Sequence, residues 1–69
     1  MKVYSLEEIR KDILKMSMDN IADMLSITKE SWRKKEGYET KLWAAELMLI
    51  FKKVKEIRPD ITIEMIKLF

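Results

Sequence analysis

Helix-breaking residues are nearly absent from this chain, and their absence constrains the fold more than any other feature. The 69 residues include one glycine, Gly37, and one proline, Pro59. Strong helix formers such as leucine, methionine, lysine and glutamate are abundant throughout. Because β-hairpins and tight turns depend on glycine and proline, this composition predicts an all-α fold. We expect a single domain, residues 1–69, since the chain is too short for two separate cores.

Two absent residue types exclude several classes of chemistry. The sequence has no cysteine and no histidine, which rules out disulfides, the common transition-metal ligands, and Ser–His or Cys–His catalytic pairs. Asp19 and Asp23 stand four residues apart, but no nucleophile, base or phosphate-binding loop accompanies them. We therefore expect no enzyme, no cofactor and no metal. The apolar runs are too short to cross a bilayer, and the N-terminus lacks a signal-peptide core, so we expect no membrane partner and a cytoplasmic location.

The first helix is marked by its N-terminal residues. Ser5 and Glu8 stand at the two positions of a capping box, and Tyr4 and Ile9 at those of a hydrophobic staple. An apolar stripe at helical spacing follows, formed by Leu6, Ile9, Ile13 and Leu14. These signals predict a helix from Leu6 to Leu14 or Lys15.

Two short helices should follow in close succession. Ser17 is the N-cap candidate for a helix from Met18 to Leu25, and Thr28 for a helix from Lys29 to Lys35 or Glu36. Gly37 marks the end of the second of these helices. Two short helices joined by a turn of about three residues form the helix-turn-helix arrangement.

The most apolar segment, residues 42–57, predicts a longer fourth helix. Its main stripe consists of Trp43, Leu47, Ile50, Val54 and Ile57. Further apolar residues widen this stripe beyond an ordinary amphipathic face, so the helix is either central in the bundle or buries a second face against another chain. Pro59 and Asp60 should end it. A final short helix is expected over residues 63–69, which gives a compact bundle of about five short helices.

The third predicted helix separates its charged and aromatic residues. At 100° per residue, Lys29, Arg33 and Lys34 share one half of the helix, whereas Trp32 lies on the other half and must pack inward. Lys35 turns toward the core, where its stem could pack while its amine reaches solvent. This division suits a helix that enters the major groove of DNA. It is equally consistent with a solvated surface helix held by one aromatic anchor.

Several residues resemble the Cro/Xre-type helix-turn-helix family of phage and bacterial repressors, whose fold is lambda-repressor-like. Ile21, Ala22 and Leu25 match the family pattern in its second helix, Ile27 and Thr28 match the turn, and Trp32 and Glu36 match the third helix. Leu6, Ile9 and Arg10 resemble the family's first helix. The resemblance implies an ion pair between Arg10 and Glu36. The sequence departs from the family at Met18, usually glutamine; at Ser26, usually glycine; and at Lys35, usually apolar or aromatic.

This resemblance implies a sequence-specific regulator of transcription, a repressor of Cro-like size in a bacterial or phage-infected cell. Its partner would be double-stranded DNA with a palindromic operator, bound as a homodimer. The base contacts expected are Lys29, Arg33 and Lys34, with Thr28 and Glu30 as secondary contacts. The phosphate contacts expected are Ser17, Asn20, Tyr38 and Lys41.

Two surfaces are candidates for the interface of such a dimer. One is formed by Ala44, Met48 and Phe51, the other by Ile66, Leu68 and Phe69. Met48 and Phe51 are better explained as parts of the core. The competing hypothesis for the whole chain is a small helical protein-interaction module or an antitoxin-like adaptor. It accounts for the low net charge of +2 and for Met18.

Overall fold

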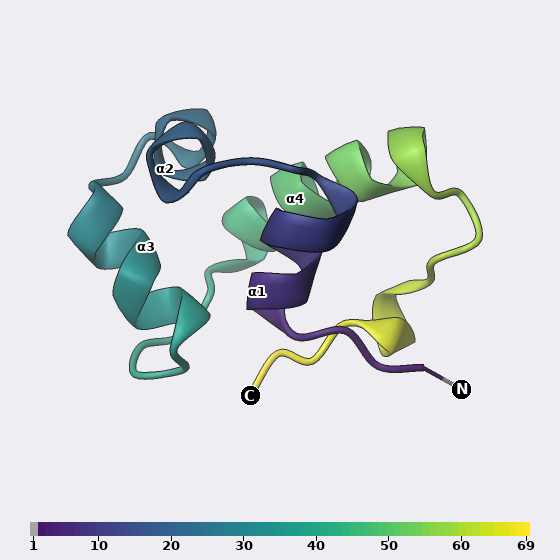
Figure 1. Ribbon diagram of the computed structural model, residues 1–69. Helices are drawn as coiled ribbons and strands as arrows, with labels where there is room; N and C mark the ends of the chain where they lie inside the picture. Colours follow the sequence, from purple (N-terminus) through teal and green to yellow (C-terminus); the bar gives the residue numbers. More distant parts are fainter. Residues whose placement is uncertain (1) are drawn as a thin grey trace.

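Helices provide all the regular elements of the computed structural model, which describes residues 2–69 (Figure 1). The four α-helices in that part of the chain are α1 (Leu6–Glu8), α2 (Met18–Leu25), α3 (Lys29–Glu36) and α4 (Ala44–Ile57). They form a body of 30 × 21 × 20 Å. The predicted all-α class is confirmed.

The first helical segment starts at a capping box and is followed by a left-handed residue. The Ser5 hydroxyl accepts from the Glu8 N–H, and the Glu8 carboxylate accepts from the Ser5 N–H, both at 3.1 Å. Beyond α1 the chain continues as a π-helical segment, Ile9–Ile13, in which the Leu14 N–H bonds to the Ile9 carbonyl at 2.9 Å. Lys15 then adopts a left-handed conformation with φ 55°. The helical run therefore covers the predicted segment, with a wider final turn.

Helices α2 and α3 have the predicted boundaries because each has its own N-cap. The Ser17 hydroxyl accepts from the Asn20 N–H, and the Thr28 hydroxyl accepts from the Ser31 N–H, each at 3.1 Å. Between the two helices Ser26 is left-handed, with φ 59° and ψ 41°. The Ile27 N–H bonds to the Ala22 carbonyl at 3.0 Å, and α2 packs directly against α3.

Helix α4 differs from its prediction in where it begins and in what it buries. It starts at Ala44 rather than Leu42, with Trp43 as the N-cap residue. Of the predicted stripe, Ile50 and Val54 are fully buried, but Trp43 is 72% exposed and Ile57 is 51% exposed. Both lie at the ends of the helix, where no neighbouring element covers them. Met48, which we assigned to the core, is also 72% exposed, so that assignment was wrong.

The C-terminal segment is not the helix that we predicted. A single 3-10 turn, Ile63–Met65, is followed by extended chain at Ile66, which forms a parallel bridge with Tyr4. The Lys67 N–H donates to the Tyr4 carbonyl at 2.8 Å. Burial of Ile66 explains this conformation, because it is 4% exposed within the core. The N-terminal and C-terminal segments thus lie side by side at Tyr4 and Ile66, although the two ends of the described chain point apart (Figure 1).

One hydrophobic core joins these elements. Its largest fully buried side chains are Trp32, Leu6, Ile9, Ile21, Ile50, Ile61 and Val54. Every helical segment contributes to this core except the 3-10 turn Ile63–Met65, which has no buried residue. The contribution of α3 is Trp32. No helix within residues 2–69 has the length and apolar character needed to cross a membrane.

Candidate nucleic-acid interface

The inner face of α3 is anchored to the N-terminal segment through Trp32 and Glu36. Trp32 is fully buried, and its indole N–H donates to the Glu36 carboxylate at 3.1 Å. The same carboxylate accepts from Arg10 Nε at 2.5 Å and from Arg10 Nη2 at 3.3 Å. Arg10 also donates to the Met16 carbonyl at 3.1 Å. The ion pair implied by the family resemblance is present, and it also fixes the tryptophan.

A second buried ion pair attaches α3 to α4. Lys35 Nζ donates to Glu46 Oε1 at 2.8 Å and to the Lys41 carbonyl at 3.2 Å, and the Lys35 residue is only 5% exposed. Glu46 Oε1 also accepts from the Trp43 N–H at 2.8 Å. Our expectation that the lysine amine would reach solvent was wrong, because it has buried partners. Glu46 was not predicted from the sequence, although its place three residues after the N-cap was an available signal.

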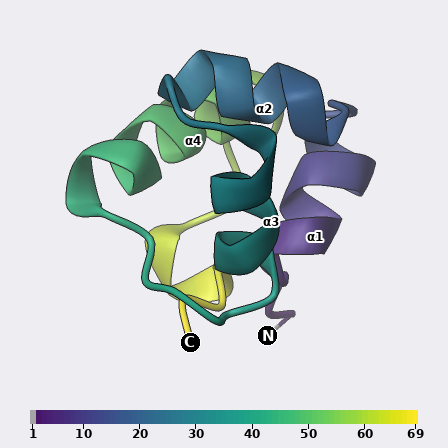
Figure 2. The ribbon, with the colours of Figure 1, turned by 90° about the vertical axis from the view of Figure 1, so that its left-hand side faces the viewer.

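These contacts determine which residues α3 presents outward. Trp32, Lys35 and Glu36 form its buried face, and the helix lies along the edge of the molecule that faces the viewer in Figure 2. Lys29, Arg33 and Lys34 are all exposed, as are Thr28 and Glu30. The structure therefore brings all five predicted base-contact residues to one exposed helix.

Two of the three cations on this surface, Lys29 and Arg33, lie beside carboxylates. Both oxygens of Glu30 accept from Arg33, at 3.0 Å from Nε and 2.6 Å from Nη2. Glu39 lies 3.7 Å from Arg33 Nη1, and Asp19 lies 3.9 Å from Lys29 Nζ. The hydrogen bonds to Arg33 lower the pKa of Glu30, and the same bonds raise the pKa of Arg33. Neither the contact of Glu39 nor the pairing of Glu30 with Arg33 was predicted from the sequence.

The start of α2 lies beside the start of α3. The Asp19–Lys29 contact joins the first turns of the two helices, and Ser17 and Asn20 are exposed there, as predicted for phosphate contacts. A helix N-terminus offers free backbone N–H groups and a positive dipole end to an anion. Lys41 is likewise exposed, beyond the other end of α3.

Tyr38 has a structural role in place of the predicted phosphate contact. Its hydroxyl accepts from the Leu6 N–H at 3.0 Å and donates to the Lys67 carbonyl at 2.8 Å. It thereby ties the segment after α3 to both ends of the domain. Since the hydroxyl proton is already donated within the chain, Tyr38 is not a free donor for a phosphate oxygen.

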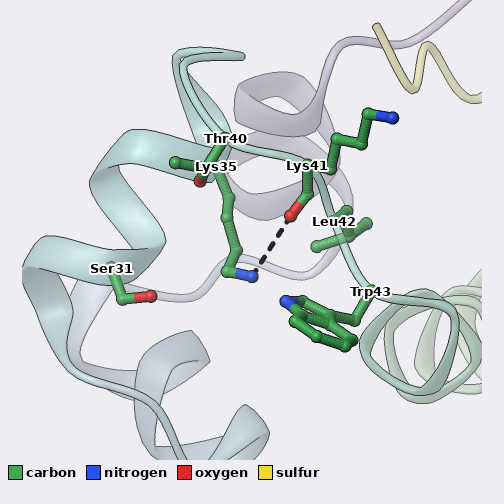
Figure 3. A pocket seen from close by; sticks show the side chains of 6 residues that line it. All are labelled: Ser31, Lys35, Thr40, Lys41, Leu42 and Trp43. Carbon is green, nitrogen blue, oxygen red and sulfur yellow. Dashed lines mark hydrogen bonds between the residues drawn. The ribbon is translucent and has the colours of Figure 1, made fainter.

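A shallow cavity of about 570 Å³ lies between α3 and the start of α4 (Figure 3). Its lining residues are Ser31, Lys35, Thr40, Lys41, Leu42 and Trp43. The Lys35 amine points across it toward the Lys41 carbonyl, above the exposed Trp43 indole (Figure 3). Within the described residues no cluster of three or more possible metal ligands occurs.

Comparisons with protein-family models, with curated proteins and with solved structures found no match for this chain. The function is therefore inferred from the geometry of the chain itself and from the motif positions in its sequence.

Proposed function

We propose that the protein is a sequence-specific double-stranded DNA-binding regulator of transcription, in which α2 and α3 act as a helix-turn-helix and α3 enters the major groove. One observation carries this proposal: α3 is anchored by buried residues along one face while Lys29, Arg33 and Lys34 project from the other. The major groove admits an α-helix, and long cationic side chains reach its base edges and the flanking phosphates.

Each outward cation has a role that follows from its chemistry. Arg33 is the principal base reader, because its planar fork matches the two acceptors of guanine. Lys34 has no ion-pair partner among the described residues, so its ammonium group is available to a base or a phosphate. Lys29 lies next to the N-terminus of α2, where Ser17 and Asn20 would hold a phosphate of the DNA backbone.

A helix of eight residues reads only a few base pairs. Recognition by a homodimer on a palindromic operator is the usual solution, with two half-sites about 34 Å apart. The exposed apolar residues of α4 and of the C-terminus, among them Met48 and Phe69, offer surface for such pairing. The proposed repressor role follows from the family resemblance.

Selection of bound duplexes from a random pool tests the proposal most directly. We expect enriched sequences that contain a palindrome, and a log affinity that falls with log salt by about 0.9 for each phosphate contact. The Arg33→Ala variant should lose about 1–3 kcal/mol of binding to the selected duplex, with an unchanged circular dichroism spectrum. Absence of any duplex binding by the folded protein at low salt would refute it.

A protein-interaction module is the second candidate, favoured by a different observation. Trp43 and Met48 are each 72% exposed and Phe69 is 89% exposed, and Trp43 borders the cavity of Figure 3. Large exposed apolar side chains are typical of protein-binding surfaces. Under this alternative, Trp43→Ser would abolish partner binding and Arg33→Ala would leave it unchanged.

A further inference from the structure

The geometry points to Glu30 as a positioning residue that aims Arg33 at guanine, rather than as the base contact that its sequence position suggested. This inference rests on the proposed DNA-binding function and names the residue that sets its specificity. It derives from the way in which the Arg33 guanidinium is placed between two carboxylates, those of Glu30 and Glu39.

The guanidinium of arginine has two edges that can each form a pair of hydrogen bonds. One edge carries Nε and Nη2, and the other carries Nη1 and Nη2, with five donors in total. Glu30 occupies the first edge, with bonds of 3.0 Å and 2.6 Å. The second edge keeps one Nη1 hydrogen and one Nη2 hydrogen, which are the two donors that a bidentate contact to guanine O6 and N7 requires. Arg33 can therefore hold Glu30 and guanine at the same time.

The local structure supports this arrangement. Glu30 and Arg33 are three residues apart on α3, which puts both on the same helical face. The Arg33 side chain remains 50% exposed and the Glu30 side chain 61% exposed, so the pair lies at the surface, where a ligand could reach it. An unrestrained arginine loses much rotamer freedom on binding, and a side chain already held in one orientation loses less.

Glu39 provides a contrast within the same site. Its carboxylate lies 3.7 Å from Arg33 Nη1, a nitrogen that does not bond to Glu30, and no hydrogen bond joins Glu39 to Arg33. Glu30 and Glu39 thus carry the same charge beside the same guanidinium, but only Glu30 orients it. The Glu30→Gln and Glu39→Gln variants separate orientation from charge.

The first experiment uses the free protein and needs no DNA. In nitrogen-15 NMR spectra at neutral pH, the Arg33 Nε–H should exchange slowly with water in the unmodified protein and in Glu39→Gln. It should exchange several-fold faster in Glu30→Gln, because the amide oxygen is a weaker acceptor than a carboxylate. Equal exchange in all three proteins would overturn the inference, whatever the protein binds.

The second experiment measures affinity for the selected duplex, for the same duplex with the contacted guanine replaced, and for random duplex. Glu30→Gln should reduce discrimination at that guanine about two- to fivefold, the order of effect expected of an exposed ion pair. Glu39→Gln should leave the discrimination unchanged and raise affinity for all three duplexes together, since it removes only a repulsive charge. If the two variants behave alike, charge rather than positioning is responsible and the inference fails, while the proposed function survives. A wild-type protein that selects no sequence would overturn both.

Discussion

Neutralising Glu46 should destabilise the protein strongly, because the largely buried Lys35 ammonium group would lose its anionic partner. The two side chains are 6% and 11% exposed, and their charged atoms are 2.8 Å apart. Removing one partner of a buried ion pair costs about 3–5 kcal/mol. Glutamine retains an acceptor for the Trp43 N–H and for the lysine, so we expect Glu46→Gln to cost about 2–3 kcal/mol. That is a large part of the roughly 3–10 kcal/mol available to a domain of this size.

A double-mutant cycle isolates the interaction from the general effect of substitution. Lys35→Met should cost a similar amount, because the Glu46 carboxylate then keeps only the Trp43 N–H. The double variant Lys35→Met/Glu46→Gln buries no charge at this site, and the remaining amide still accepts from Trp43. We expect its unfolding free energy to lie within about 1 kcal/mol of the wild-type value, as is common when a buried pair is replaced by neutral groups.

Urea unfolding followed by circular dichroism provides the measurement. With a slope of about 1 kcal/mol per molar for a domain this small, each single variant should shift the midpoint by about 2 M or more. High salt should change these differences little, because buried charges are poorly screened. Additive losses in the double variant, or a Glu46→Gln cost below about 0.5 kcal/mol, would show that Lys35 is solvated and would refute the reasoning.

Two further predictions concern the backbone and the response to acid. Ser26 is left-handed at φ 59°, which costs a residue with Cβ about 1–2 kcal/mol. After the entropy of glycine is subtracted, Ser26→Gly should raise the free energy of unfolding in urea by about 0.5–1 kcal/mol; a less stable variant would contradict this. Hydrogen bonding to the Ser5 N–H lowers the pKa of Glu8 below 4.5, so its stabilising effect is full above that value and is lost as pH falls through the lower folded-state pKa. The difference in free energy of unfolding between wild type and Glu8→Gln should therefore become smaller as the pH falls from about 6 to about 3. A difference that does not change with pH would argue against the capping role of Glu8.

Local signals made part of the fold predictable. The boundaries of α2 and α3 follow from Ser17, Thr28 and Gly37, because a cap acts on backbone groups only three or four residues away. The capping box at Ser5 marked the start of α1 in the same way. The pairing of Glu30 with Arg33 was not predicted, but the sequence would have allowed the prediction, because the two residues are three positions apart on one helix.

The spacing of apolar residues alone did not predict the contacts between distant segments. The sequence predicted a longer α4 and a C-terminal helix, but the end of the chain is held by a bridge to Tyr4 and by the Tyr38 hydroxyl, which lies 29 residues from its Lys67 partner. Arg10 and Glu36, 26 residues apart, were paired only through a family resemblance. Nothing in the spacing of apolar residues specifies such partners.

The sequence by itself determined that the chain is helical, where α2 and α3 begin, and which face of α3 carries Lys29, Arg33 and Lys34. Tertiary structure decided that Lys35 is buried against Glu46, that Trp43 is left exposed, and that Glu39 lies beside Arg33. The physical reason is one of range. Helix propensity and capping act between near neighbours, whereas burial and ion pairing depend on which distant segments the folded chain brings together.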